Sequence, residues 1–179
     1  MSLLRLAYRG NPVLRMKIPP MTREEILSSE AGLLVDALWE VLAEQQYGLG
    51  LCASQLHVNS QMFVAHFPQT EFAEDVDPLP KTSFFNPRLR LTSEDEIQQW
   101  EGNLSIPGIV GLVSRKSSCI IDYLDENAKP RAILATGILS GLLQHEWDML
   151  QGIDFVDRMS DRAKRRYLLP MGQPGLLSS

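Results

Sequence analysis

Hydrophobic positions recur at helical spacing most clearly in residues 135–152, ATGILSGLLQHEWDMLQG. With successive residues about 100° apart around a helix axis, one arc collects a mostly apolar set: His145, Ile138, Met149, Leu142, Glu146, Leu139, Leu150, Leu143 and Trp147. The opposite arc holds small and polar residues: Ser140, Gln151, Gln144, Gly137, Asp148 and Gly141. This separation predicts a helix that is buried along one broad face and ends at Gly152.

Glu146 lies in the middle of this apolar arc. An ionised carboxylate that leaves water without a partner is strongly destabilising, so its position needs an explanation. One explanation is structural: the carboxylate caps a neighbouring backbone or pairs with an arginine, and the adjacent His145 is a satisfied core histidine. The other is chemical, because a histidine can ligate a metal while the neighbouring carboxylate moves a proton.

The rest of the chain combines one further helical pattern with several short apolar runs. Prolines in the first 20 residues predict an extended arm that wraps around the body. Thr22 and Glu25 have the spacing of a capping box, and apolar positions extend the predicted helix to about Gln46. Strands are predicted at 56–58, 61–66, 82–91, 118–124 and 131–136, the last two as a hairpin around a turn at 125–130.

Two stretches are predicted to be irregular and a third to be a short helical tail. Residues 67–81 are acidic and contain prolines, which is typical of an exposed loop. The glycines and the proline within 101–115 argue against a regular element there. The tail after residue 152 concentrates positive charge: Arg158, Arg162, Lys164, Arg165 and Arg166. This basic cluster is either a solvated surface or a contact for the ribosome or nucleic acid.

Composition indicates an ordinary globular chain. Its 179 residues predict one domain over 1–170 with a loosely held tail at 171–179. The net charge of −5 argues against broad binding to nucleic acid or anionic membranes. Neither a signal peptide nor a run of 18 apolar residues is found, so we expect a cytoplasmic protein without a membrane partner. Cys52 and Cys119 are expected to remain buried thiols.

Three stretches together resemble the signature motifs of the peptide deformylases. GLGLCASQ at 48–55, EGNLSIPG at 101–108 and QHEWDMLQG at 144–152 are similar to G-x-G-x-A-A-x-Q, E-G-C-L-S and H-E-x-x-H, in that order. The resemblance extends from the N-terminal arm to the end of the central helix. It implies an α+β fold with antiparallel sheets around the motif helix. It also implies the activity of the family, which removes the formyl group from the N-terminal formylmethionine of new bacterial polypeptides.

The resemblance also implies roles for particular residues. In the family, a cysteine and two histidines hold a divalent ion, usually Fe²⁺, with Zn²⁺ or Ni²⁺ as substitutes, and a water completes the site. His145 matches the first histidine and Glu146 the residue that carries the proton. Gln55 and the N–H of Leu104 match the oxyanion donors. Gly48 and Gly50 match the segment whose backbone receives the peptide.

Two of the three ligand positions differ from the family pattern. Asn103 stands at the position of the cysteine and Met149 at that of the second histidine, which leaves His145 as the single matching ligand. An amide oxygen and a thioether are weak ligands for Fe²⁺ or Zn²⁺, so no metal is expected to bind tightly. We expect Asn103 to hydrogen-bond His145 in a dry polar network and Met149 to pack in the core. Cys52 is not expected to serve as a replacement ligand.

Three functional hypotheses follow from these residues. The first is a deformylase homologue that has lost metal-dependent removal of N-formyl groups but keeps a cleft for the N-termini of new polypeptides. The second is an active deformylase with an unusual site, in which His145, the Asn103 oxygen, water and the Met149 sulfur hold Fe²⁺, Zn²⁺ or Ni²⁺. The third is a binding or regulatory protein that uses the basic cluster.

Overall fold

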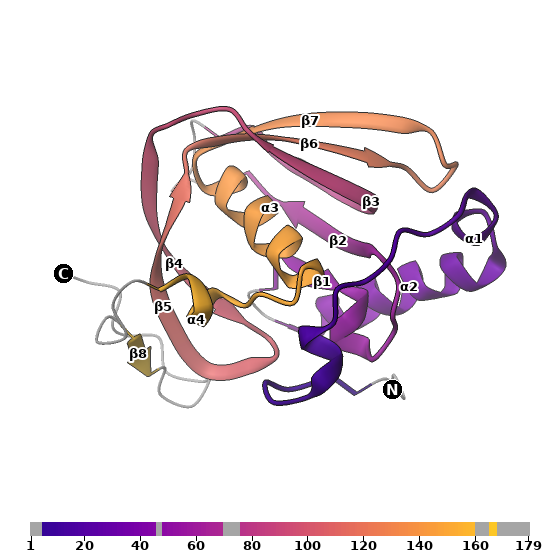
Figure 1. The fold of residues 1–179 in the computed structure, drawn as a ribbon, viewed down its shortest axis with the longest axis horizontal. Helices are drawn as coiled ribbons and strands as arrows, with labels where there is room; N and C mark the ends of the chain where they lie inside the picture. Colours follow the sequence, from indigo (N-terminus) through magenta and orange to yellow (C-terminus); the bar gives the residue numbers. More distant parts are fainter. Residues whose placement is uncertain (1–4, 46–47, 70–75, 160–164, 168–179) are drawn as a thin grey trace.

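The central feature of the fold is a helix enclosed by two antiparallel sheets (Figure 1). The computed structural model describes residues 5–45, 48–69, 76–159 and 165–167. The central helix is α3 (Gly137–Leu150). The larger sheet has the order β1-β2-β3-β6-β7, with β1 (Gly50–Cys52), β2 (Met62–Phe67), β3 (Leu79–Leu91), β6 (Ser118–Leu124) and β7 (Pro130–Thr136). The smaller has the order β4-β5-β8, with β4 (Glu96–Asn103), β5 (Ile106–Lys116) and β8 (Arg165–Tyr167). The predicted α+β class is confirmed.

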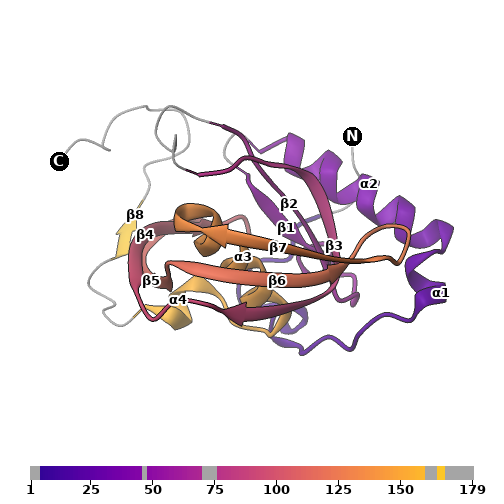
Figure 2. The ribbon, with the colours of Figure 1, turned by 90° about the horizontal axis from the view of Figure 1, so that it is seen from above.

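The larger sheet separates two hydrophobic clusters. Side chains alternate across β2, so that Phe63 and Ala65 join the cluster on the α3 side whereas Met62 and Val64 join the cluster beside α2 (Ser29–Ala43). Figure 2 shows α2 and α3 on opposite sides of this sheet. The site-bearing helix is therefore packed against one face while the first long helix supports the other.

The predicted helix over residues 22–46 is divided into two. The capping box is confirmed, because the Glu25 N–H donates to Thr22 Oγ1 at 3.2 Å and the Thr22 N–H donates to the Glu25 carboxylate at 2.6 Å. The first helix, α1 (Arg23–Ile26), nevertheless ends after one turn. Ser28 interrupts the helix because its Oγ caps the start of α2, accepting from the Ala31 N–H at 3.2 Å.

Most of the predicted strands are confirmed, but two predictions were wrong. Residues 53–56 form a 3-10 turn, and His57 after it has φ of 61°, so the predicted strand at 56–58 is absent. Residues 101–115, predicted to be irregular, belong to the β4–β5 hairpin, in which Asn103 pairs with Ile106. Gly111 in this hairpin is required by close packing, because a Cβ on it would lie 3.1 Å from the Phe155 ring.

The prediction of a single buried face on α3 was also wrong. Gln144 and Asp148, on the predicted polar arc, are 5% and 2% exposed. Their arc packs against β5, and the Gln144 amide donates to the Lys116 carbonyl at 2.8 Å. Ile138, placed on the apolar arc, is 44% exposed. A helix enclosed by two sheets can bury its polar side because strand backbone supplies the hydrogen-bond partners.

The N-terminal arm lies against the body of the molecule, as predicted, and it crosses the end of α3. The helix ends near Gly152, whose φ is +75°, and a Cβ there would lie 2.6 Å from the Arg15 carbonyl oxygen. Arg15 also donates to the Gly152 carbonyl at 3.0 Å and to Asp154 at 3.0 Å, and it pairs with Asp157. We call these contacts the arm clasp. Further along, the Asn86 amide binds the Met21 N–H and carbonyl, each at 2.8 Å.

The segment after α3 differs from the predicted helical tail. A single helical turn, α4 (Phe155–Arg158), follows α3, and β8 then pairs with β5. Residues 160–164 and 171–179 lie outside the described residues, so the domain boundary after residue 170 stays a prediction. Among the described residues, no helix is long and apolar enough to span a membrane.

Candidate functional site

The three motifs meet where α3 passes between the two sheets. Gln55 comes from the 3-10 turn Ala53–Leu56, Asn103 ends β4, and His145 and Met149 lie one turn apart on α3. Hydrogen bonds connect all four side chains. The structure thus brings together side chains from all three motifs, which lie far apart in the sequence.

The Asn103 carboxamide is the centre of this group. Its Oδ1 accepts from Gln55 Nε2 at 3.1 Å and from the Ser105 N–H at 2.7 Å. Its Nδ2 lies 3.0 Å from His145 Nε2 and 3.4 Å from the Met149 sulfur. The Ser105 backbone nitrogen is always a donor, so it fixes which end of the amide is oxygen. All four hydrogen-bonding positions of the Asn103 side chain are therefore used, and the predicted bond to His145 is confirmed.

These partners define the tautomer and the protonation state of the His145 ring. Nδ1 lies 2.8 Å from the Glu101 carboxylate, which accepts the ring proton, whereas Nε2 faces the N–H group of Asn103 and must offer its lone pair. Burial lowers the pKa of His145, but the hydrogen bond and charge of Glu101 outweigh it and raise the pKa. Asn103 acts against protonation at Nε2. The geometry therefore corresponds to a neutral ring with its proton on Nδ1.

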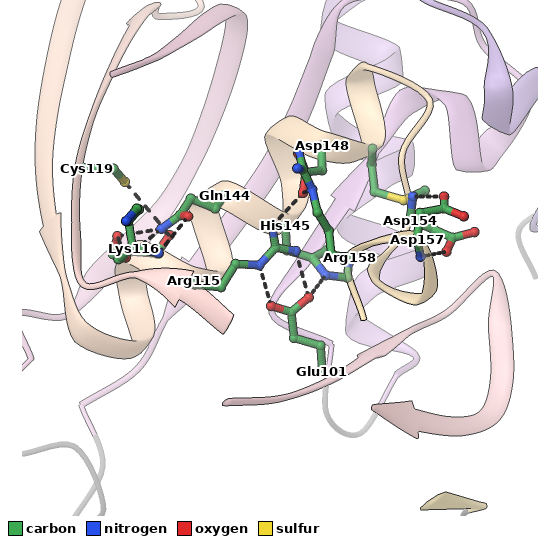
Figure 3. A network of polar contacts seen from close by, with 12 residues as sticks. Glu101, Arg115, Lys116, Cys119, Gln144, His145, Asp148, Asp154, Asp157 and Arg158 are labelled. Carbon is green, nitrogen blue, oxygen red and sulfur yellow. Dashed lines mark hydrogen bonds and ion pairs between the residues drawn. The ribbon is translucent and has the colours of Figure 1, made fainter. Parts of the chain in front are cut away.

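Behind His145 lies a network of alternating charges that is buried except at Arg158 (Figure 3). Arg115 donates to both Glu101 oxygens, at 2.7 and 2.9 Å, and to Asp148 at 2.5 Å. Arg158 donates to Asp148 at 2.9 and 2.5 Å. Burial raises the pKa of Glu101, but the hydrogen bonds from Arg115 and His145 prevail and hold it at about 2. A permanently ionised Glu101 therefore orients the imidazole.

Sequence reasoning missed Glu101, Arg115 and Asp148. Glu101 lies in a segment that was predicted to be irregular, and Asp148 was placed on the arc of α3 that was predicted to be polar. A signal was present in the motif itself, because Glu101 begins EGNLS and strand alternation directs its side chain to the same face as Asn103. Arg115 stands 14 residues later, on the paired strand, and carries no comparable signal.

Glu146 occupies a separate, adjacent position. It is 3% exposed, and burial raises the pKa of its carboxyl group. The Cys52 thiol donates to its Oε2 at 3.3 Å. A Cβ on Gly50 would lie 2.7 Å from Glu146 Cδ, so the absence of a side chain on Gly50 gives the carboxylate its space. Burial and then the charge of Glu146 raise the pKa of Cys52 well above its ordinary value.

The outer edge of β1 adjoins Glu146. The strand ends its sheet, pairing with β2 alone among the described residues. Just before β1, the Leu49 carbonyl accepts from the His66 N–H at 2.9 Å. Because antiparallel pairing alternates along a strand, the N–H and C=O of Gly50 point away from β2. Gly48 is placed differently, since its carbonyl lies 3.1 Å from His66 Nε2.

The two predicted oxyanion donors differ in whether their N–H groups are already hydrogen-bonded. Both N–H positions of the Gln55 amide are engaged, by Asn103 Oδ1 and by Ser105 Oγ, each at 3.1 Å. Its Oε1 accepts from the Cys52 N–H at 2.9 Å. Leu104 lies in the turn between β4 and β5, and among the described residues its N–H has no acceptor. Leu104 therefore retains a donor that Gln55 does not.

The potential metal donors around His145 are few. Across the described parts of the chain, no group of three or more His, Cys, Asp or Glu side chains is arranged to hold a metal ion. The atoms nearest His145 Nε2 are the Asn103 amide nitrogen and, through it, the Met149 thioether. The donor set is thus one imidazole, one carboxamide and one thioether.

Fold and motifs together define an α+β protein with a histidine–glutamate helix at its centre, and comparisons with known proteins identify its family. The pattern of the family described as polypeptide deformylase matches residues 3–165. A peptide deformylase of Thermomicrobium roseum is 33% identical over 168 residues, which cover 94% of this chain and 92% of the relative. Peptide deformylase 2 of Xanthomonas campestris is 33% identical and covers 89% of each. This chain belongs to the polypeptide deformylase family.

Solved structures agree with this assignment. A class I type b peptide deformylase from Acinetobacter baumannii, crystallised with Met-Ala-Ser bound, superposes with a TM-score of 0.81 at 26% identity, covering 89% of this chain and all of that one. A peptide deformylase from Synechococcus elongatus in complex with actinonin gives a TM-score of 0.77 at 32% identity, with 92% and 82% coverage. The deformylase fold implied by the motifs is therefore confirmed.

Proposed function

We propose that this chain is a peptide deformylase homologue that has lost metal-dependent deformylation and keeps a cleft for the N-terminus of an extended peptide. The observation that carries the proposal is the saturated carboxamide of Asn103. Its nitrogen lies against the one imidazole lone pair that a cation would need. Its oxygen is held by Gln55 and the Ser105 N–H, and so it is turned away from His145.

The donor set supports the loss of the metal. Fe²⁺, Zn²⁺ and Ni²⁺ are held in proteins by thiolate, imidazole and carboxylate groups, whereas the Asn103 and Met149 side chains on the Nε2 side of His145 supply an amide and a thioether. A cation would have to break the Asn103–His145 hydrogen bond and would gain a neutral amide and a thioether in exchange. These residues therefore do not fit a tightly bound divalent ion.

The oxyanion donors support the loss of turnover. A developing oxyanion is stabilised by donors that are preorganised and unoccupied. The Gln55 amide is already bound to Asn103 and Ser105, so it could reach a substrate oxygen only by giving up a hydrogen bond. Loss of one such donor typically lowers kcat by about 10²–10³.

The strand edge supports retention of peptide binding. An extended peptide can add to a sheet edge through main-chain hydrogen bonds, which require no metal. The outward N–H and C=O of Gly50 on β1 are such groups, and Glu146 lies beside them. The Acinetobacter relative is described with the tripeptide Met-Ala-Ser bound, and we propose that an equivalent segment of peptide binds here.

A second candidate function is an active deformylase with an unusual metal site. The observation that favours it is the burial of Glu146, because a raised carboxyl pKa suits a residue that accepts and returns a proton. In that case His145, the Asn103 oxygen, a water and the Met149 sulfur would be the ligands. The Asn103 side chain would have to rotate to present its oxygen.

Metal analysis of anaerobically purified protein, followed by a deformylation assay with formyl-Met-Ala-Ser, tests the two candidates. We expect less than 0.1 metal ion per chain and no turnover. One Fe, Ni or Zn per chain together with turnover would establish the second candidate. The double variant Asn103→Cys with Met149→His is expected to regain stoichiometric Zn²⁺ or Co²⁺, since it restores a thiolate and a second imidazole around an intact Glu101–His145 pair.

A further inference from the structure

A cavity lies on the side of the larger sheet that α2 covers, behind the segment that leads into β1. Its volume is about 310 Å³, which falls within the range of about 300–1,000 Å³ for pockets that bind small molecules. Of the described residues that line it, none comes from α3, so the cavity is separate from the histidine–glutamate pair. Six of them supply polar groups or apolar surface to the cavity: Trp39, Leu42, Gln45, Leu49, His66 and Lys81.

Two neighbouring strands bring His66 and Lys81 together at this cavity. Ala65 on β2 pairs with Thr82 on β3, and His66 and Lys81 are the adjacent residues of the two strands. Because side chains alternate across a strand, both point to the face opposite the Ala65 side chain. Ala65 belongs to the hydrophobic cluster on the α3 side. His66 and Lys81 therefore lie on the α2 side.

Trp39 and His66 form an aromatic corner in the cavity. Their ring centroids are 6.0 Å apart and the ring planes are inclined by 62°. The Gly48 carbonyl accepts a hydrogen bond from His66 Nε2 at 3.1 Å. The neutral imidazole therefore keeps a lone pair on Nδ1, to which no described residue donates. The corner offers a ligand two aromatic neighbours and one hydrogen-bond acceptor.

Lys81 gives the cavity a positive charge. It is the one charged side chain among the described residues that line the cavity. Its Nζ lies 5.2 Å from the centroid of the Trp39 ring, within the range of a cation–π interaction. No carboxylate of the described segments lies within ion-pair distance of Lys81, and the Gln45 side-chain amide has no partner there either. The cavity thus presents donors that an anionic group would satisfy.

We propose that this cavity binds a small aromatic carboxylate, with its ring against Trp39 and His66 and its carboxylate on Lys81. Hydrogen bonds between an ammonium and a carboxylate are about twice as strong as those between neutral groups. Aromatic rings favour offset or edge-to-face contacts with one another, and Leu42 and Leu49 supply further apolar surface. A ring with an N–H group would also donate to His66 Nδ1. This site is distinct from the peptide cleft, so its failure would leave the proposed function unchanged.

The lining of the cavity argues against other classes of small ligand. A cationic ligand would be repelled by Lys81. A strongly hydrated inorganic anion would have to lose water against Trp39, Leu42 and Leu49, and one ammonium group would not offset that loss. An aromatic carboxylate avoids both costs, because its charge and its apolar ring match different parts of the cavity.

Nuclear magnetic resonance tests this inference with three ligands that share an indole ring and differ in the charge of the end group. Indole-3-acetate is an anion, indole-3-acetamide is neutral and tryptamine is a cation. The indole N–H signal of Trp39, assigned with Trp39→Phe, should shift on binding. We expect indole-3-acetate to bind about three- to fivefold more tightly than the amide, the size expected for a partly exposed ion pair, and tryptamine to bind most weakly. Equal affinities, or no shift of the Trp39 signal at about 5 mM ligand, would overturn the inference.

A variant identifies Lys81 as the group that binds the carboxylate. Lys81→Gln removes the charge, so the affinities for indole-3-acetate and indole-3-acetamide should become equal within about 1.5-fold. Lys81→Arg should retain the preference for the anion. Lys17→Gln, at another exposed lysine, is the matched control and should behave like the unaltered protein. A preference that survives in Lys81→Gln would overturn the role of Lys81.

Two measurements on the unaltered protein cover the case in which Lys81→Gln disturbs the fold. Raising NaCl from about 20 to 300 mM screens exposed charges, so it should roughly halve the preference for indole-3-acetate over the amide. A preference that does not change with salt would contradict binding of the carboxylate by Lys81. Cyclohexylacetate should bind at least about threefold more weakly than phenylacetate, since it lacks an aromatic ring. Equal affinities for these two would overturn the role of the aromatic corner.

Discussion

At the scale of single residues, Asn103 shows what a carboxamide can do that a thiol cannot. An amide has a donor side and an acceptor side. It can therefore accept a hydrogen bond from Gln55 and donate one to His145 at the same time. A cysteine at the same position would offer one weak donor and one weakly accepting sulfur. The Asn103 side chain thus satisfies the hydrogen-bonding groups of both neighbours.

Replacement of Asn103 by alanine should lower the free energy of unfolding. It would leave His145 Nε2, Gln55 Nε2 and the Ser105 N–H with fewer partners, and each buried polar group that finds no water costs about 1–3 kcal/mol. Urea denaturation should show a loss of at least about 2 kcal/mol. The matched control is Asn59→Ala, at an exposed position, which should stay within about 0.5 kcal/mol of the unaltered protein. Equal effects for the two variants would contradict the importance of the amide.

For Gly141→Ala, one neighbouring side chain decides whether the substitution stabilises or destabilises the protein. Glycine to alanine in a helix normally stabilises by about 0.5–1 kcal/mol, but a Cβ on Gly141 would overlap the Gln99 amide. We expect Gly141→Ala to displace the Gln99 amide from its 3.0 Å hydrogen bond to Glu101, and so to destabilise by up to about 1 kcal/mol. In a Gln99→Ala background the same change should become neutral or stabilising. Gly32→Ala, with open space around it, is the control and should stabilise.

At the scale of elements, the arm clasp depends on the charge of its acidic residues. Burial acts to raise the pKa of Asp157, but the hydrogen bond from Arg15 and the nearby guanidinium charges hold the pKa below its ordinary value of 3.8. A carboxyl whose folded pKa is lowered contributes stability above its unfolded pKa and loses it as the pH falls below that value. The clasp should therefore weaken below about pH 4.

The contribution of Arg15 should follow this pH dependence. At pH 6, Arg15→Ala is expected to cost about 1 kcal/mol, the upper range for partly exposed ion pairs. At pH 2.5 the difference from the unaltered protein should be smaller, since the pH then lies below the ordinary pKa of Asp157 and the stability linked to its ionisation is being lost. Arg23→Ala is the control, because Arg23 donates to the Ala128 carbonyl at 3.1 Å, which does not titrate. A cost of Arg15→Ala that is independent of pH would contradict this account.

The elements that could be predicted from the sequence are those whose pattern is local. The position of α3, the Thr22 capping box and the β6–β7 hairpin were predicted correctly because periodicity and turn residues define them. The β4–β5 hairpin was missed because its glycines were interpreted as breaks, whereas Gly111 makes room for Phe155. β8 was missed because its pairing with β5 depends on a distant strand. Tertiary contacts decided both cases.

The motif residues of the site were predicted from the sequence. The residues that only support the motif residues were missed. His145, Glu146, Gln55 and Asn103 were identified from spacing and resemblance, and the Asn103–His145 bond followed from simple hydrogen-bond matching. Arg115 could not be identified, because nothing in its local sequence distinguishes a buried arginine from an exposed one. A buried charged side chain of this kind can be recognised only when the strand that carries it has been placed in the fold.

At the scale of the whole molecule, the site should make folding independent of metal. A ligand that binds the native state alone raises the melting temperature, so removal of a bound metal would lower it. We expect thermal unfolding with and without a strong chelator to agree within about 1 °C. The Asn103→Cys, Met149→His variant is the positive control and should lose several degrees on chelation. A chelator-dependent midpoint in the unaltered protein would contradict the metal-free site.

Both thiols of the molecule lie in its core. Cys52 and Cys119 have no exposed surface, and burial raises the pKa of each. Reaction with aromatic disulfide reagents requires an accessible thiolate, so the native protein should be inert to them and should release two equivalents of reaction only as it unfolds. Because both cysteines of the chain are enclosed in the core, thiol reactivity becomes a direct readout of global unfolding.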